Sequence, residues 1–363
     1  MVKVNDIYKF IDSFAPFATS MDFDNCGLLV GNNNANVDNV LVSLDITNRV
    51  VEEAINLGAN LIISHHPVIF KPMKNVMHDS VVYNLIKNDI SAICAHTNLD
   101  MAEDTGVNTC LANALELKNL RPLSIYKSEN YNKIVVFVPE PNANDVIKSM
   151  SSAGAGILGN YSECSFSSSG TGTFRPNNNS NPFIGKVGHF EKVNECRVEM
   201  ICDKSKTQSV IKAMLNSHPY EIPAYDIFET SAIKHNISCG LIGDLKNEYS
   251  ANSFAKYVKD KLHCNGIRYF NFNDNIKTVA LCSGAGGDMI SRAINENVSA
   301  FITGEIKHHE IIMAEQNNVS VFEAGHFKTE DVVIHPLINK LKEKFKQTNF
   351  VKSKYFTDQS LYV

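Results

Sequence analysis

Residues 60–67 read NLIISHHP, an apolar run that ends in two histidines and a proline. A short apolar run bounded by turn residues is typical of a strand that is buried inside a sheet. Two further runs, NVLVSLDI (39–46) and SAICAHTNLD (91–100), lie on either side of it, and helices are expected near 48–58 and 79–88. Strands that alternate with helices predict an α/β fold with parallel layering.

The C-terminal part of the chain repeats this pattern. Three strand-like runs follow one another, KTVALCSGAGG (277–287), SAFITGE (299–305) and VSVFEAGH (319–326), and a last helix is expected after His335-Pro336. Because both ends of the chain alternate strands and helices, we expect them to form the two halves of one sheet domain.

The middle of the chain has a different pattern. A strand, YNKIVVFVPE (131–140), precedes a helix at 143–152, and the Ser/Asn/Gly/Pro-rich stretch 167–182 is expected to be a loop. A second strand (196–203), a helix entered through Ser209 (209–218) and a final strand (224–230) follow. The order β-α-β-β-α-β predicts a small ferredoxin-like α+β unit over 128–235. This unit would interrupt a discontinuous α/β domain formed by 1–127 and 236–363.

Composition narrows the classes of function. The 363 residues include 34 Lys+Arg against 39 Asp+Glu, a net charge of −5, which gives no support to nucleic-acid binding. No apolar run approaches the ~20 residues of a membrane span, and the start, MVKVNDIYKF, lacks the pattern of a signal peptide. We therefore expect a cytoplasmic protein without a membrane partner. The nine cysteines form no CxxC pair and are interpreted as reduced thiols that mostly contribute to packing.

Four strand-like runs end on residues that could bind a metal ion. These residues are His65 and His66, His96 and Asp100, Glu305 and His309, and His326 and Glu330. In open α/β sheets the loops at the carboxyl ends of parallel strands converge on one crevice, where ligands bind. We therefore expect these side chains to meet.

Each of these endings also has a plainer interpretation. The pair His65-His66 could be a solvated turn, Asp100 a cap or an Asx-turn, and the spacing of His326 and Glu330 is common in helices. Together, however, these five residues make a mixed imidazole and carboxylate set, which suits two cations about 3.5–4 Å apart with a bridging carboxylate. Without a cysteine among them, the set favours Zn, Mn, Fe or Co over a thiolate-bound structural zinc.

Other residues near these endings are candidates for supporting roles. We assign His96, Glu305, His309 and Gly304 to orienting the ligands or facing the substrate, because imidazoles that bind metal need a partner on the other ring nitrogen. For these polar side chains, partial exposure without a function is the alternative. Glu330, Glu305 and His96 are the candidates for moving a proton. The stretch SGAGGD (283–288) is interpreted as a tight strand-to-helix turn rather than an anion site.

The segments SHHPVIF (64–70), HTNLD (96–100), TGEIKHHE (303–310) and GHFKTE (325–330) resemble the Nif-three-like family. Its members often carry the label GTP cyclohydrolase I type two homologue. The stretch FDNCGLLVG (23–31) matches the early WDN-x-GL segment of that family, although Phe23 replaces the usual Trp. A second departure lies in CGLIGDL (239–245), where Leu241 replaces an Arg.

The resemblance implies a fold, a ligand set and an assembly. The ligands of a dinuclear metal site would be His65, His66, Asp100, His326 and Glu330. The fold would be an α/β domain built from two related lobes, and residues 128–235 resemble the PII/CutA-like insert of longer members. The assembly would be a hexameric toroid of identical chains with its metal sites facing the interior.

Three hypotheses of function follow. The first is a metal-dependent hydrolase that holds two divalent ions per chain, zinc foremost, and acts on a nucleotide-like or purine-derived small molecule. The second is a non-catalytic protein that binds or delivers metal. The third, regulation through nucleotide binding to the insert, has the least support, because the 167–182 loop has no basic cluster beyond Arg175.

Overall fold

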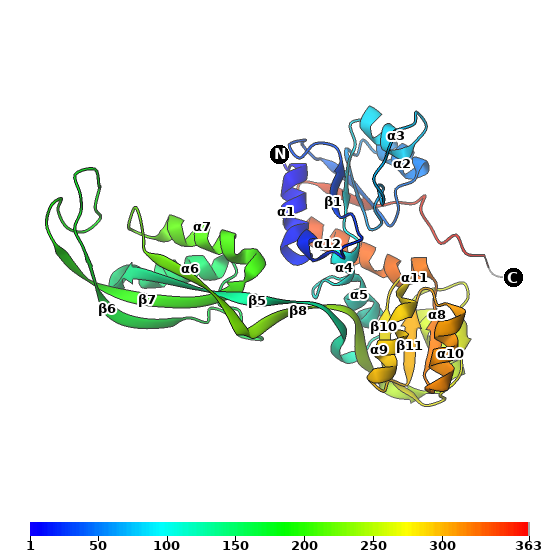
Figure 1. Ribbon diagram of the computed structural model, residues 1–363. Coiled ribbons are helices and arrows are strands. Elements are labelled where there is room, and N and C mark those ends of the chain that lie inside the picture. Colours follow the sequence, from blue (N-terminus) through cyan, green and yellow to red (C-terminus); the bar gives the residue numbers. More distant parts are fainter. Residues whose placement is uncertain (362–363) are drawn as a thin grey trace. The chain divides into compact units, whose positions relative to one another are not determined.

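The computed structural model describes residues 1–361 and divides the chain into two compact units. Unit 1 joins Met1–Tyr126 to Ile237–Val363, and unit 2 is Lys127–Asn236. Figure 1 traces the elements of each unit along the chain. None of the helices found in residues 1–361 combines the length and the apolar character that a membrane crossing requires. All nine cysteines are free thiols.

The first lobe of unit 1 is built on a five-stranded sheet of order β1-β4-β3-β2-β13. Strands β2, β3, β4 and β13 run parallel, while β1 is an antiparallel edge strand. The strands are β1 (Gly27–Val30), β2 (Asn39–Ser43), β3 (Leu61–Ser64), β4 (Ser91–Cys94) and β13 (Asn349–Lys352). The helices of this lobe are α1 (Val4–Phe14), α2 (Asn48–Asn56), α3 (Val81–Lys87), α4 (Thr97–Asp100), α11 (His326–Glu330) and α12 (Ile334–Lys344).

Strand β3 is buried on both faces, as its apolar sequence predicts. Leu61 and Ile63 pack with residues of α1 and α12, whereas Ile62 points to the opposite face and packs with residues of α2 and α3. None of the three side chains is exposed, and each such burial stabilises the fold by about 1.5–3 kcal/mol. Packing on both faces thereby fixes the position of the strand, and His65 and His66 follow at its carboxyl end.

The strands of the second lobe of unit 1 belong to an eight-stranded sheet, in which they have the order β8-β10-β11-β12-β9. Strands β10 to β12 are parallel, and β8 and β9 pair with them antiparallel. The strands are β8 (Tyr225–Tyr249), β9 (Arg268–Phe270), β10 (Ile276–Cys282), β11 (Ala300–Thr303) and β12 (Ser320–Glu323), and the helices are α5 (Val107–Ala114), α8 (Ala251–Lys261), α9 (Ile290–Asn295) and α10 (His308–Gln316). One core cluster joins this sheet to α5 and α8, and another joins it to α9 and α10.

The two ends of the chain lie in one unit, but they build two sheets rather than one. Both edges of the first sheet are already filled, by β1 on β4 and by β13 on β2. Strands β10 to β12 therefore build a separate sheet, and only the short β13 returns from the C-terminal region to the first one. The result is a domain of two lobes, as the family resemblance implies.

The strands of unit 2 take the order β6-β7-β5-β8 within the same eight-stranded sheet, and α6 and α7 cover one face of them (Figure 1). Its elements are β5 (Lys118–Pro139), α6 (Ala143–Ser152), β6 (Phe166–Phe174), β7 (Glu191–Asp203), α7 (Thr207–Ser217) and β8. Strand β7 pairs antiparallel with both β5 and β6. This is the predicted ferredoxin-like arrangement. The predicted fold class, a two-lobed α/β domain interrupted by an α+β insert, is therefore confirmed.

Two local expectations in unit 2 are wrong. The stretch 167–182 is expected to be a loop, but its first half forms edge strand β6. The sequence does not predict this strand, because its Ser, Thr and Gly residues are mostly exposed and show no apolar alternation. Helix α7 begins at Thr207 rather than after Ser209, because a 3-10 turn at Lys204–Lys206 leads into it. The Ser209 hydroxyl instead donates a hydrogen bond to the carbonyl oxygen of Lys206.

Candidate metal centre

Three histidines direct their Nε2 atoms toward the carboxylate of Glu330. Its Oε1 lies 3.1 Å from His326 Nε2 and 3.8 Å from His65 Nε2, and its Oε2 lies 3.1 Å from His66 Nε2. The Oδ1 atom of Asp100 is 3.5 Å from His65 Nε2. The structure thus brings together all five residues of the predicted ligand set, although they follow three different strands.

The adjacent histidines reach the same place because the chain bends as it leaves β3. The backbone N–H groups of His65 and His66 donate to the carbonyl oxygens of Ser43 and Leu44, which holds both residues beside the end of β2. Their ring centroids lie 5.0 Å apart and their planes are tilted by 50°. The two side chains therefore point toward one site, whereas neighbouring residues on a regular strand would point to opposite faces.

The last two ligand candidates lie on one face of the short helix α11. Gly325, at the point where the chain leaves β12 for α11, has a φ of 87°, a left-handed conformation that favours glycine. The helix then starts at His326, and one turn brings Glu330 beside it, as their i,i+4 spacing predicts.

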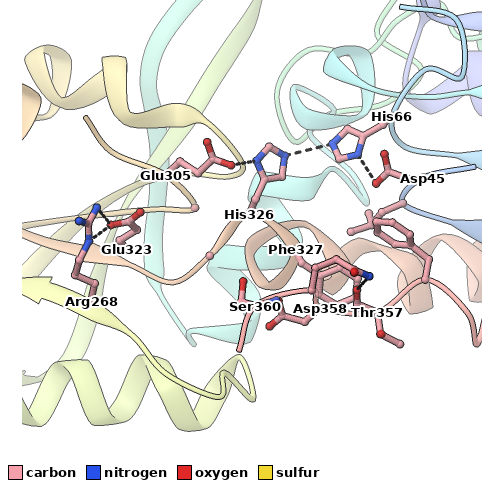
Figure 2. Close-up of a pocket in the computed structure, with 15 residues that line it drawn as sticks. Asp45, His66, Arg268, Glu305, Glu323, His326, Phe327, Thr357, Asp358 and Ser360 are labelled. Carbon is pink, nitrogen blue, oxygen red and sulfur yellow. Dashed lines mark hydrogen bonds and ion pairs between the residues drawn. The ribbon is translucent and has the colours of Figure 1, made fainter. Parts of the chain in front are cut away.

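Each imidazole of the cluster has an acceptor on its Nδ1 atom. The pairs are His65 with Ala95 O at 2.9 Å, His66 with Asp45 Oδ2 at 2.9 Å, His96 with Asp24 Oδ1 at 2.9 Å, and His326 with Glu305 Oε1 at 2.7 Å. An acceptor at Nδ1 favours the tautomer that carries its proton there and leaves the lone pair on Nε2. Figure 2 shows this for two of the rings, with Asp45 on the outer side of His66 and Glu305 on the outer side of His326.

The charges of the cluster are strongly coupled. Burial raises the pKa of Glu330, but the facing imidazoles of His65, His326 and His66 outweigh it and hold the pKa well below its usual range. Burial lowers the pKa of His66, yet contacts with Asp45 and Glu330 raise it to about 10. The hydrogen bond with Glu330 is the main cause that raises the pKa of His326 to about 9. Without a metal ion, protons supply the positive charge that the Glu330 carboxylate requires.

The donor set fits a divalent cation. His65 Nε2 is buried and has no hydrogen-bond partner within the described chain, a state that costs about 1–3 kcal/mol. A Cβ atom on Gly284 would lie 2.2 Å from Glu330 Oε1 and 3.3 Å from His326 Nε2, so the glycine keeps space open beside the ligands. Two sets of three residues could each hold an ion, His65-His66-His96 and His66-His326-Glu330. Within each set the ligand atoms lie within 4.8 Å of one another. Imidazole and carboxylate ligands of this kind suit Zn, Mn, Fe or Co.

The supporting candidates from the sequence have different surroundings. His96 belongs to the cluster, with its ring centroid 5.1 Å from that of His65. Glu305 contacts His326 while 59% of its side chain is exposed. Gly304 is a point of close approach, where a Cβ would lie 2.8 Å from His326 Cα. His309 is not brought to the cluster: its side chain is 73% exposed, and its ion-pair contact is Glu310 at 3.9 Å.

Sequence reasoning missed two carboxylates, Asp24 and Asp45. Asp45 follows strand β2 and could have been found by the same rule that selected the other strand ends. Asp24 lies in the FDN segment, where it accepts hydrogen bonds from the backbone N–H and the hydroxyl of Thr97 as well as contacting His96. Burial raises the pKa of Asp24, but His96 and Thr97 more than offset this and leave the carboxylate ionised.

Two cavities of about 520 Å³ each reach the cluster, and both are lined by His66 and His326. We call the first the tail-side cavity, because it is also lined by the C-terminal residues 356–360. Its other lining residues include Asp45, Glu305, Arg268 and Glu323. In Figure 2 Arg268 is paired with Glu323 at its wall. We call the second the aromatic cavity, because Phe23 and Phe70 line it. His96, Asp100 and Glu330 line it as well. Small molecules can therefore approach the cluster from two sides.

Comparisons with known proteins find similar sequences and structures along nearly the whole chain. The chain is 39% identical over 331 residues to a Bacillus subtilis protein named "GTP cyclohydrolase 1 type 2 homolog", covering 90% of this chain and 88% of the relative. It is 34% identical to a protein of the same name from Halalkalibacterium halodurans, with 98% of each chain covered. A crystal structure of a Bacillus cereus protein related to NIF3 superposes with a TM-score of 0.89 at 37% identity, covering 100% of this chain and 99% of the other. The sequence model of the Duf34/NIF3 (NGG1p interacting factor 3) family matches residues 2–359, and the chain therefore belongs to this family.

Proposed function

We propose that the chain is a metal-dependent hydrolase with a dinuclear centre in unit 1. His66, His326 and Glu330 would hold one divalent cation, and His65, Asp100 and Glu330 would hold the other. The observation that carries the proposal is the convergence of three Nε2 atoms on one buried carboxylate. Zinc is the first candidate, and Mn, Fe and Co suit the same donors.

The chain's own residues would orient the reaction and move its proton. When bound, two divalent ions lower the pKa of a water ligand and polarise a substrate carbonyl, imine or phosphoryl oxygen. Glu330 is unsuited to carrying a proton, because it is buried and both of its oxygens face imidazoles. The exposed Glu305 can exchange a proton with solvent, and it orients His326 at the same time. His96, oriented by Asp24, would serve the face of the aromatic cavity.

The substrate that we propose is a nucleotide-like or purine-derived small molecule. Phe23 and Phe70 support this, because their rings lie 6.4 Å apart beside the cluster and are 62% and 46% exposed. A planar heterocycle could stack on such a pair, since aromatic rings attract one another in offset or tilted arrangements. The name of the curated relatives, GTP cyclohydrolase 1 type 2 homolog, points to the same class.

The test uses the full chain, stripped of metal and reloaded with Zn or Mn. We expect hydrolysis of at least one member of a panel of purine nucleotides, nucleosides and bases. The His65→Ala variant should lose this activity, whereas His309→Ala, which removes an exposed histidine outside the cluster, should retain it. Activity that survives in His65→Ala would refute the mechanism, and so would a metal-loaded chain that turns over none of the panel.

A second candidate function is metal binding or delivery without catalysis. It is favoured by the accessibility of the cluster, because the side chains of His66 and His326 are 21% and 35% exposed and both cavities reach them. Transfer of bound Zn to a chelator separates the two functions. A delivery protein should lose its metal within seconds to minutes, whereas a hydrolase should retain it over many turnovers.

We propose in addition that the chain assembles as a homohexamer in the cytoplasm, and that unit 2 serves as a PII/CutA-like insert. Apolar side chains exposed in the single chain, such as Met77 at 66% and Ile86 at 57%, support an oligomer. Light scattering on the purified protein should give about six times the chain mass of 40.3 kDa. A monomer at micromolar concentration would contradict this assembly.

A further inference from the structure

We propose that a cavity in unit 2 binds a small organic cation, an ammonium or amidinium group carried on a flat apolar body. This insert cavity has a volume of about 480 Å³ and is formed by unit 2 alone. The residues that carry the argument are Glu195, Gly172, Phe174, Phe183, Tyr220 and Ile222. The proposed activity of the metal centre does not depend on this site.

The cavity lies on the face of the sheet that α6 and α7 leave uncovered. In β7, Val198 and Met200 point into the core cluster that includes residues of both helices. Glu195 is three residues before Val198 in a regularly paired strand, so its side chain points to the opposite face. There it lines the insert cavity and is only 9% exposed. A carboxylate thus lies at the buried wall of an otherwise mainly apolar cavity.

No cationic side chain in the described part of unit 2 forms an ion pair with this carboxylate. Its hydrogen-bond donor is a neutral group, the Tyr220 hydroxyl, at 2.8 Å from Oε1. The nearby His218 is held as a neutral ring, because its Nδ1 accepts from the Tyr220 N–H and its Nε2 donates to the Phe137 carbonyl. Burial lowers the pKa of His218 further below its usual value. A buried carboxylate without a counter-charge is costly, and a cation in the cavity would remove that cost.

The chain makes room for the carboxylate. Gly172 lies on the neighbouring strand β6, and a Cβ atom there would come 2.1 Å from Glu195 Oε2. The second oxygen of Glu195 therefore lies over a glycine rather than against a side chain. Any larger residue at position 172 would push the carboxylate away from its present place.

Aromatic rings surround the same space. The ring of Phe174 lies 5.8 Å from that of Tyr220 in an edge arrangement, and Phe183 lies 6.5 Å from Tyr220. Ring faces attract cations, and the attraction is stronger where the cation is desolvated. A carboxylate beside aromatic rings is thus complementary to an organic cation. The one arginine of the neighbouring loop, Arg175, donates to the Gly188 carbonyl and lies over Phe190, so it offers no anion site in this cavity.

The test compares three probes of similar shape on the full chain after treatment with a chelator. Benzylammonium, benzyl alcohol and benzoate differ in charge and share the flat ring, and binding is measured by titration calorimetry and ligand-observed NMR. We expect benzylammonium to bind once per chain and at least roughly tenfold more tightly than benzyl alcohol, as one charge-assisted contact provides. Benzoate should not bind.

Two variants and a matched control locate the site. Glu195→Gln removes the charge and keeps the side-chain size, and should weaken benzylammonium binding about tenfold or more. Ile222→Lys, at a position that is 84% exposed at the cavity wall, should also weaken binding through repulsion and cannot disturb the core. The control Glu199→Gln alters a carboxylate of the same strand that is already paired with Lys133 and Arg197, and should bind normally.

Several results would overturn the proposal. These are unchanged binding in Glu195→Gln, equal binding of benzyl alcohol and benzylammonium, preference for benzoate, or no binding of any probe. The last result would also arise if a second copy of the chain covered the cavity, which equally excludes a small-molecule site. Folding of each variant is checked by its thermal transition, which should lie close to that of the unaltered chain.

Discussion

His66 Nε2 lies 3.3 Å from His326 Nε2, although 260 positions separate the two residues along the chain. Each histidine follows a parallel strand of a different sheet, β3 in the first lobe and β12 in the second. The Glu330 carboxylate lies 3.1 Å from both ring nitrogens. The two lobes therefore meet at their strand ends, and the charge between the two rings is balanced by one buried carboxylate.

The first prediction concerns Glu330 itself. Glu330→Gln keeps the size of the side chain but removes the charge that faces three imidazoles, so metal affinity should fall by more than about 100-fold, a larger loss than removal of an outer partner causes. Metal content by mass spectrometry should drop from two ions per chain to one or none. The matched control is Glu53→Gln, which alters a buried carboxylate that accepts hydrogen bonds from Ser353 and Lys354 and is not part of the ligand cluster. That variant should lose stability and keep its metal.

The second prediction concerns the outer partner of His66. In Asp45→Asn the amide can no longer neutralise the imidazole or fix its Nδ1 proton as strongly, and metal affinity should fall about 10–100-fold. Asp79→Asn is the control, because Asp79 also contacts the Nδ1 of a neighbouring histidine, His78, but does so on the exposed surface. If both variants bind metal equally well, the orientation of His66 does not depend on Asp45.

The meeting of His65, His66, Asp100, His326 and Glu330 could be predicted from the sequence because its signals are local. His65 and His66 end a buried apolar run, and His326 and Glu330 share one turn of a helix, so each pair is visible within a few residues. The meeting of these pairs follows from the rule that the ends of parallel strands converge. Whether the strands share one sheet does not follow from that rule, and the structure has them in two sheets.

Other features depend on contacts that no local pattern encodes. Asp24 reaches His96 across 72 positions through a loop whose spacing gives no sign of it. Strand β6 is an exposed edge strand of Ser, Thr and Gly residues, a composition that turns and loops share. His309 resembles a ligand in sequence, yet it lies on the outer side of α10. A histidine next to a glutamate in the sequence therefore predicts a metal ligand only when it also lies directly at the end of a strand.

The third prediction concerns pH. In the metal-free chain the pKa of His66 is raised to about 10 and that of His326 to about 9. Both rings are therefore in the cationic imidazolium form at pH 8, each with one proton more than the neutral ring. Metal must displace these protons to reach Nε2, and about two protons per chain should be released. Calorimetry at pH 8 in buffers of different ionisation enthalpy measures this number. A value near zero would contradict the prediction.

The same shifts determine the stability of the metal-free chain. A folded-state pKa above the unfolded value of about 6.5 means that the folded chain binds protons more tightly than the unfolded one. This stabilisation is fully present below pH 6.5 and is lost as the pH rises through 9 and 10. The Tm of the metal-free chain should therefore fall between pH 8 and pH 10.5 by more than that of the metal-loaded chain, whose ligands carry no such protons.

The last prediction separates backbone strain from contact with the ligands. Gly284 has a φ of 58°, and an added Cβ would lie 2.2 Å from Glu330 Oε1, so Gly284→Ala should both destabilise the fold and displace the carboxylate. Gly58 has nearly the same φ, 61°, but nothing lies within 4 Å of the position of its Cβ. Gly58→Ala should therefore lose only the strain energy, about 1–2 kcal/mol, and keep two metal ions per chain. Because the two variants share the strain, a loss of metal confined to Gly284→Ala arises from crowding of the ligands, chiefly of Glu330 and less of His326. If Gly284→Ala also keeps both ions, the carboxylate can move without losing its ligand role, and its bridging position between the lobes is not required.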